Sequence, residues 1–385
     1  MPILLDYEAL RLIWWVLLGI LLIGFAVMDG FDLGVATLLP FIAKNDDERR
    51  VLLNTIGPVW EGNQVWFILG GGALFAAWPA IYAVAFSGLY LAMLAVLGAL
   101  ILRPVGFKYR SKLLSPTWRK WWDRVIFLGG FLPALLFGVA MGNVLLGLPF
   151  RFDDDMRLSL EGGLFSLLTP LPLVAGLISV GMLVMHGAAF LQFKTTGIVR
   201  NRAAKAGQWA AILTALLFMA TGLWMLSGYW GLDGYQITQT VDPQAASNPL
   251  AKTVGREMGA WLGNYQLYPW MMAAPIVGIL GALVATISLW RRFVWLGFIC
   301  SGLAIAGIIS TVGLSMFPFI LPSSLDPASS LLVWDASSSH LTLWWMLIAV
   351  VVFLPIVLTY TAWVFRVLRG PVTIEHIRED DKGSY

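Results

Sequence analysis

Two carboxylates lie three residues apart in a long apolar run near the N-terminus, in the stretch MDGFDLG (28–34). Residues three apart share one face of a helix, so Asp29 and Asp32 are expected to be neighbours. Two anionic carboxylates this close repel each other, which favours retention of a proton by one of them. Charged groups at membrane depth are costly and often mark ion or proton paths. The pair could therefore pass protons or hold a cation, or each acid could be neutralised by an arginine or a helix N-terminus and only lock the packing.

A third carboxylate, Glu61, stands in the stretch VWEGNQVW (59–66), where an apolar run begins. An acid near a helix N-terminus is stabilised as an anion by the helix dipole. The amide side chains of Asn63 and Gln64 follow just inside. This pattern predicts the entrance of a proton wire, and the alternative is a capping acid followed by two packing amides.

The remaining polar residues in or beside the apolar runs are expected to have structural roles. Arg103 closes one run and is near enough to the membrane to pair with an intramembrane aspartate. The cations that follow it, Lys108, Arg110 and Lys112, are typical of an orientation signal. His186 lies in mid-run, and without a second axial residue nearby we expect a core histidine with a hydrogen-bonded neighbour rather than a haem ligand.

The composition shows what kind of protein must position these groups. Of the 385 residues, 59% are hydrophobic and 12% are charged, against about 25% charged residues in ordinary soluble domains. This excludes a water-soluble globular enzyme. A lone Cys300 excludes a disulfide framework and a cysteine-clustered metal site, and with three histidines the chain is poorly equipped to ligate several haems by itself. The Lys and Arg residues fall in short loops, which does not suit nucleic-acid binding.

Apolar runs of about 20 residues, enough to cross a bilayer, predict an all-α integral membrane protein with nine transmembrane helices in a single membrane domain over 1–385. The expected spans are 10–42, 63–78, 80–102, 125–148, 164–192, 207–230, 268–290, 293–318 and 339–366, followed by a short tail at 367–385.

The distribution of Lys and Arg predicts the orientation of these spans. Twenty of the 25 lie in the tail and in the loops after the first, third, fifth and seventh spans. This places the N-terminus in the periplasm and the C-terminus in the cytoplasm. Two long segments, 231–266 and 319–338, are then external loops with turn chemistry, and the stretch DASSS (335–339) is expected to cap the ninth helix.

Residue chemistry alone leaves several function classes open. Many spans with intramembrane acids also suit an ion-coupled secondary transporter. A membrane scaffold without a proton role would differ from a proton-conducting subunit only at Glu61 and its neighbours.

The chain resembles subunit II, the smaller subunit, of cytochrome bd-type quinol oxidases, along its length from Asp6 to the tail. The motifs that carry the resemblance are DYE (6–8), IWW (13–15), DGFD (29–32), NDDERR (45–50), WEGNQVW (60–66), GGALFAAWP (71–79), RP (103–104), GN (142–143), SNPL (247–250) and MFP (316–318).

This resemblance implies a fold of two four-helix bundles plus one peripheral helix, in the bacterial cytoplasmic (inner) membrane. It implies a heterodimer with a larger subunit I that carries two haems b, one haem d and the quinol site, together with a small single-span accessory subunit and membrane lipids. The complex would oxidise quinol and reduce dioxygen to water, with proton uptake from the cytoplasm. This chain would hold no catalytic residue and no metal, and the resemblance leaves room for a structural quinone in it.

The resemblance also implies roles for single residues. Glu61 matches the position of an acid at a proposed cytoplasmic proton entrance, and Trp66 matches a tryptophan near a proposed dioxygen route. Asp29 and Asp32 match a buried acidic pair on the proton path, and Arg103 matches a buried arginine that balances it.

Expectations also follow for three residues beside Glu61 and for one residue shortly after Arg103. Trp60, Asn63 and Gln64 are expected to support the charge balance or the structure around these groups. Lys108 stands where the family often has Asp, which removes a proton role from this loop position.

Overall fold

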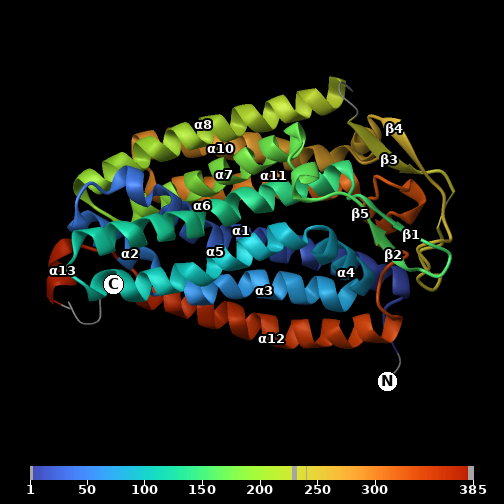
Figure 1. The fold of residues 1–385 in the computed structure, drawn as a ribbon, viewed down its shortest axis with the longest axis horizontal. Coiled ribbons are helices and arrows are strands. Elements are labelled where there is room, and N and C mark those ends of the chain that lie inside the picture. The colour runs from blue at the N-terminus through green and yellow to red at the C-terminus, as the bar shows by residue number, and fades with distance from the viewer. Residues whose placement is uncertain (1–2, 228–231, 240, 380–385) are drawn as a thin grey trace.

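A computed structural model describes residues 3–227, 232–239 and 241–379. Its helices run side by side in an elongated bundle, with the strands gathered at the end where α1 begins and with α2 and α13 at the opposite end (Figure 1). Among the described residues, eight helices are long and apolar enough to cross a membrane. They are α1 (Tyr7–Ile42), α5 (Tyr90–Tyr109), α6 (Pro116–Leu146), α7 (Pro170–Lys194), α8 (Gly197–Ser227), α10 (Ala273–Arg291), α11 (Val294–Met316) and α12 (His340–Val367). The multi-pass membrane architecture predicted from the sequence is thereby confirmed.

Shorter helices fill the remainder of the helical part: α2 (Asp46–Ile56), α3 (Trp60–Ala77), α4 (Pro79–Gly88), α9 (Gly263–Leu267) and α13 (Ile374–Glu379). Single 3-10 turns are η1 (Arg110–Lys112), η2 (Leu164–Leu167), η3 (Ala260–Leu262), η4 (Pro269–Met272) and η5 (Pro327–Ser329). The expected second span, 63–78, corresponds to α3, whose 18 residues start with a polar turn. The total of nine spans stays a prediction for this reason.

The expected third span, 80–102, is divided between two helices in the structure. It consists of α4 and α5, which meet at Leu89, where the backbone leaves the helical conformation (φ −102°, ψ 18°). The preceding Gly88 is a weak helix former, so the apolar run contains a break that its hydropathy does not reveal. Two other helices begin well before their expected starts at 125 and 207, because α6 from Pro116 and α8 from Gly197 continue beyond the apolar run as polar turns. Residues 228–230 of the expected sixth span lie outside the described residues.

Three antiparallel strand pairs lie outside the long helices. They are β1 (Phe150–Phe152) with β2 (Leu158–Leu160), β3 (Asp233–Ile237) with β4 (Val254–Met258), and β5 (Phe319–Leu321) with β6 (Leu331–Leu332). The segments expected as loops at 231–266 and 319–338 thus contain hairpins, and the all-α expectation holds for the membrane-crossing part only. Strands this short carry too little alternation to be distinguished from loops in the sequence.

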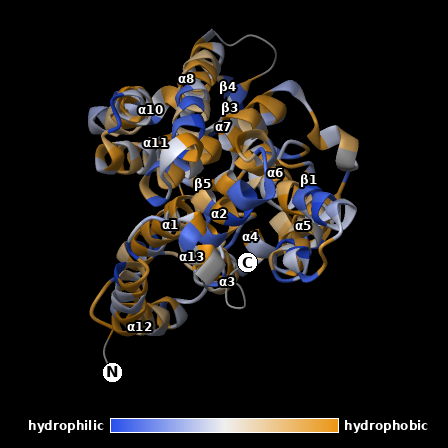
Figure 2. Ribbon diagram, turned by 90° about the vertical axis from the view of Figure 1, so that its left-hand side faces the viewer, coloured by the Kyte–Doolittle hydropathy of each residue, from blue (hydrophilic) through white to orange (hydrophobic). Residues whose placement is uncertain are grey.

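Helix α1 occupies the centre of the bundle and packs against α3, α6, α7 and α11. Apolar residues dominate the long helices in the end-on view, including the outer ones (Figure 2). Helix α12 lies at the periphery, and within its described length only Leu343 is buried. This position agrees with a peripheral helix, whereas the grouping into two four-helix bundles stays a prediction.

A buried arginine ties α1 to the loops at the strand end of the molecule. Arg11 is fully buried in the second turn of α1. Its Nε donates to Ser337 Oγ (2.8 Å), its Nη1 to the Pro243 carbonyl (2.5 Å) and its Nη2 to Ser247 Oγ (3.0 Å). One side chain therefore holds two loops that lie 90 residues apart in the sequence at Ser247 and Ser337, and one of them carries the SNPL motif.

A buried ion pair fastens the same two loops. Lys252 Nζ lies 2.6 Å from Asp335 Oδ2, with both side chains almost wholly buried, and it also donates to the Pro249 carbonyl (2.7 Å). Burial lowers the pKa of Lys252 and raises the pKa of Asp335, while the ion pair opposes both shifts. The expectation that the stretch DASSS (335–339) caps the last long helix is confirmed. Within this stretch, Ser339 caps α12 by accepting from the Thr342 amide, and Asp335 forms the ion pair with Lys252.

We expect Asp335→Asn to lower the free energy of unfolding by about 3–5 kcal/mol, because removing one partner of a buried ion pair leaves the other charge uncompensated. The double variant Lys252→Met with Asp335→Leu should lie much closer to the wild type, since it buries no charge. Thermal unfolding of the purified protein in detergent, followed by tryptophan fluorescence, measures both. Equal losses of unfolding free energy in the single and the double variant would contradict this role of the ion pair.

Candidate functional site

The intramembrane acid expected to meet Arg103 does so. Asp29 lies on α1 and Arg103 on α5, and Arg103 Nη2 donates to Asp29 Oδ1 at 2.7 Å. Both side chains are completely buried. The sequence prediction that this arginine pairs with an intramembrane aspartate is therefore confirmed.

The second acid, Asp32, has a neutral partner. Asn63 of α3 donates from Nδ2 to Asp32 Oδ2 at 2.8 Å, and both side chains are buried. Within the described residues, Asp29 Oδ2, Asp32 Oδ1 and two guanidinium nitrogens of Arg103 have no hydrogen-bond partner. The acid–arginine cluster, defined as Asp29, Asp32, Asn63 and Arg103, thus brings together side chains from three helices and retains free polar atoms.

The cluster is unbalanced in charge. With both carboxylates ionised and the guanidinium protonated, it would carry one net negative charge in a dry interior, which is energetically costly. One proton, placed on Asp32, makes the cluster neutral, since Asp32 is the carboxylate without a direct arginine contact. The arrangement can therefore hold one exchangeable proton or one monovalent cation.

Two glycines of α6 allow the helices to come close enough to build this cluster. A Cβ at Gly129 would lie 3.2 Å from the Cβ of Arg103 on one side. A Cβ at Gly130 would lie only 2.7 Å from the Leu33 carbonyl oxygen of α1 on the other side. Helix α6 consequently fits between the backbones that carry the arginine and the acids.

Aromatic side chains close the cluster. The Arg103 guanidinium lies 5.8 Å from the centre of the Trp60 ring, a distance that allows cation–π attraction. Trp60 packs in turn on Phe107 with ring centres 5.8 Å apart. Trp66 is buried one and a half turns further along α3 and packs on Gly24 of α1, where a Cβ would lie 2.6 Å from the ring. Trp66 is thus part of the wall between α1 and α3.

Glu61 and Gln64 are not brought into the cluster. Glu61 is exposed on the outward face of α3, and Gln64 is half-buried. Within the part of the chain that the structure describes, neither side chain has a hydrogen bond or an ion pair with another residue. Of the two amides expected just inside Glu61, only Asn63 faces the acids, because the two side chains point about 100° apart on the helix.

His186 of α7 is a core histidine with hydrogen-bonded neighbours, as predicted. Its Nδ1 lies 2.7 Å from Ser301 Oγ and its Nε2 lies 3.0 Å from the Val27 carbonyl. The ring stacks on Phe298 at 4.7 Å between centres. Since both ring nitrogens are engaged, His186 does not fit the role of an axial haem ligand.

Sequence reasoning missed a second buried network at the α2 end of the bundle. Arg110, expected as an orientation signal, is fully buried, and its Nε donates to Asp123 Oδ1 at 2.5 Å. Its Nη2 lies 2.8 Å from Asp46 Oδ1, and Arg119 binds the other oxygen of Asp46 at 2.5 Å. The sequence carried one signal for this network. Asp46 and Asp123 both lie beside apolar runs, and the charge count places both acids on the same side of the membrane as Arg110. Lys108, by contrast, is exposed.

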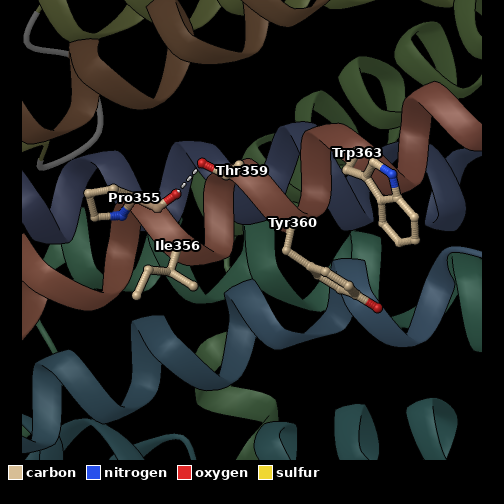
Figure 3. Close-up of a pocket in the computed structure, with 5 residues that line it drawn as sticks. All are labelled: Pro355, Ile356, Thr359, Tyr360 and Trp363. Carbon is tan, nitrogen blue, oxygen red and sulfur yellow. Dashed lines mark hydrogen bonds between the residues drawn. The ribbon is translucent and has the colours of Figure 1, made fainter.

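A shallow apolar depression of about 570 Å³ lies on the outer face of α12 (Figure 3). Its lining residues all come from this helix: Pro355, Ile356, Thr359, Tyr360 and Trp363. Thr359 Oγ1 donates to the Pro355 carbonyl (2.7 Å), so its hydroxyl is already used. No charged side chain lines the depression, and it is separate from the acid–arginine cluster.

Comparison with known proteins places the whole chain in one group. The family model described as cytochrome bd terminal oxidase subunit II matches residues 10–368. Among curated proteins, the probable cytochrome oxidase subunit 2 of Haemophilus influenzae is 48% identical over 380 residues, which cover 99% of this chain and 100% of the relative. The cytochrome bd-I ubiquinol oxidase subunit 2 of Escherichia coli K12 has the same identity and coverage.

More distant relatives agree. The cytochrome bd ubiquinol oxidase subunit 2 of Bacillus subtilis is 31% identical over 367 residues, covering 94% of this chain and 96% of the relative. Among solved structures, a chain of the bd oxidase from Geobacillus thermodenitrificans superposes with a TM-score of 0.70 at 17% identity, covering 94% of this chain and 98% of that chain. At this identity the structural match speaks for the fold.

Proposed function

The chain belongs to the cytochrome bd terminal oxidase subunit II family, and from this premise we propose how it serves the oxidase. It is a subunit of a quinol-oxidising, dioxygen-reducing complex of the respiratory chain, and its partner is subunit I. The two haems b, the haem d and the quinol site belong to that partner in this proposal. His186 of this chain does not fit a haem, because both of its ring nitrogens are hydrogen-bonded.

The acid–arginine cluster handles protons for the reduction of dioxygen to water. The observation that carries this proposal is the imbalance of two buried carboxylates against one guanidinium. Arg103 holds Asp29 in an ion pair, and Asp32 takes up and releases the proton that neutralises the cluster. Asn63 orients Asp32 through its amide, which can donate to the carboxylate in either protonation state.

Glu61 is the proton inlet, and the partner subunit covers it. Glu61 stands in the first turn of α3, at the end of the bundle that the Lys and Arg distribution predicts to be cytoplasmic. Its exposed position on an otherwise apolar helix face supports an inlet at the interface with subunit I. A carboxylate there takes protons from the cytoplasm and is only two residues from Asn63, which contacts Asp32. Uptake from this side and release of quinol protons outside make the reaction electrogenic.

Further parts of the proposal follow the family resemblance. The complex resides in the bacterial inner membrane, a small single-span subunit joins it, and a structural quinone is accommodated in this chain. The wall formed by Trp66 and Gly24 borders the route of dioxygen. Family membership favours this function over the ion-coupled transporter. The two experiments below distinguish the proposed proton-conducting subunit from a scaffold without a proton role.

We expect Glu61→Gln to slow dioxygen reduction roughly a hundredfold, the low end of proton-transfer contributions, because glutamine cannot exchange a proton. The haem absorption spectrum of the complex should be unchanged. Oxygen consumption with a soluble quinol measures the effect, and Glu257→Gln, an exposed acid of β4 at the opposite end, is the matched control. Normal turnover of Glu61→Gln would leave the scaffold as the better description.

We expect Asp29→Ala to prevent accumulation of the haem d-containing complex, because Arg103 is left as an uncompensated buried charge, at a cost of about 3–5 kcal/mol. The double variant Asp29→Leu with Arg103→Met removes both charges and should restore assembly but not the rate of dioxygen reduction. The haem d band per milligram of membrane protein measures assembly. Full activity of the double variant would show that the cluster carries no protons.

A further inference from the structure

Helix α6 carries a stripe that changes from basic to aromatic along its length. Lys120, Arg124, Phe127 and Phe131 follow one another at spacings of four, three and four residues, which places them on one helical face. The Phe127 and Phe131 rings are stacked with centres 5.5 Å apart. Phe41, at the end of α1, meets Phe127 at 6.0 Å and is 63% exposed. The stripe therefore leads from cations to an open aromatic surface.

A cavity of about 360 Å³ opens at the basic end of this stripe. Its lining residues come from α1, α2 and α6, and they are Pro40, Arg49, Lys120, Asp123, Arg124 and Phe127. The volume is sufficient for a phosphate group with its immediate ester substituents. The cavity therefore joins three cations and the start of the aromatic surface in one place.

The charge of this cavity is positive. Its one acid, Asp123, is already bound by Arg110 at 2.5 Å and lies 3.5 Å from Arg49. Arg49 keeps a buried Nε without a hydrogen-bond partner. Across the described residues, Lys120 and Arg124 are exposed and have no acidic partner. Three cations therefore face one acid whose charge Arg110 already balances.

The position of the cavity along α6 matches the boundary between water and lipid. Trp121, in the same turn as Lys120, is 58% exposed, and exposed tryptophans prefer the headgroup level of a bilayer. Phe127 and Phe131 stand about 10 and 16 Å further along the helix at 1.5 Å per residue. The cations thus lie at headgroup level and the aromatic rings at acyl-chain level.

We propose that this cavity binds the phosphate of an anionic phospholipid whose acyl chains lie on Phe41, Phe127 and Phe131. Basic pockets between transmembrane helices suit anionic headgroups, and guanidinium groups bind phosphate through paired hydrogen bonds. The aromatic surface that continues from the cations is the reason for choosing a lipid rather than free phosphate. This site lies apart from the acid–arginine cluster and does not depend on the proton path.

The test titrates the purified, delipidated complex with phosphatidylglycerol and counts bound lipids by native mass spectrometry. In the double variant Lys120→Gln with Arg124→Gln, the tightest binding step should weaken about 30-fold, from about 1 kcal/mol per lost cation near an anionic headgroup. The control is Lys205→Gln with Arg291→Gln, which removes two exposed cations from α8 and α10 at the same end of the bundle, and its tightest step should be unchanged. Lys120→Arg with Arg124→Lys should retain tight binding.

Other outcomes separate the alternatives. Phe127→Ala should weaken the tightest phosphatidylglycerol step, because the acyl chains lose an aromatic contact. Undiminished affinity for phosphatidylglycerol in the Lys120→Gln/Arg124→Gln variant, with its haem spectrum intact, would overturn the proposal. Displacement of the lipid by inorganic phosphate at equal concentration would also overturn it, since the cavity would then be a site for the free anion.

Discussion

Two carboxylates and one guanidinium buried in a membrane-spanning bundle are the constraint on which the other features depend. An isolated charge in such an interior costs several kcal/mol, and an ion pair recovers that cost only with good geometry. The 2.7 Å contact between Arg103 and Asp29 provides that geometry, but it requires α1, α5 and α6 to approach closely. The paired glycines of α6 and the contact of Asn63 from α3 are consequences of this requirement.

The charged groups differ in how completely they are balanced. At the strand end, Lys252 and Asp335 form a one-to-one pair, and Arg11 is held by hydroxyl and carbonyl oxygens. At the other end, Arg110 is bound by two aspartates that further arginines also contact. Both arrangements lock loops and helix ends. The central cluster, among the buried groups described, retains an excess carboxylate, which makes it suitable for exchanging a proton.

The sequence predicted the features that depend on composition and on helical spacing. Apolar runs located the long helices, and the three-residue spacing of Asp29 and Asp32 placed both on the side of α1 that meets its partners. It did not predict the burial of Arg11, Arg110 and Lys252, because counting cations by loop treats every lysine and arginine as solvated. The break at Leu89 and the hairpins also escaped prediction, since a short interruption or a three-residue strand hardly changes the local hydropathy or periodicity.

The opposite orientations of the Asn63 and Glu61 side chains indicate how this chain depends on a partner. The two residues are only two positions apart in sequence, yet the Asn63 amide faces the buried acids and the Glu61 carboxylate faces outward. A proton that enters at Glu61 must pass from one face of α3 to the other. Such transfer in a membrane needs the outer face to be enclosed by protein, because lipid offers no polar groups to conduct it. A subunit II chain thus supplies one side of a path, and the covering subunit I supplies the other.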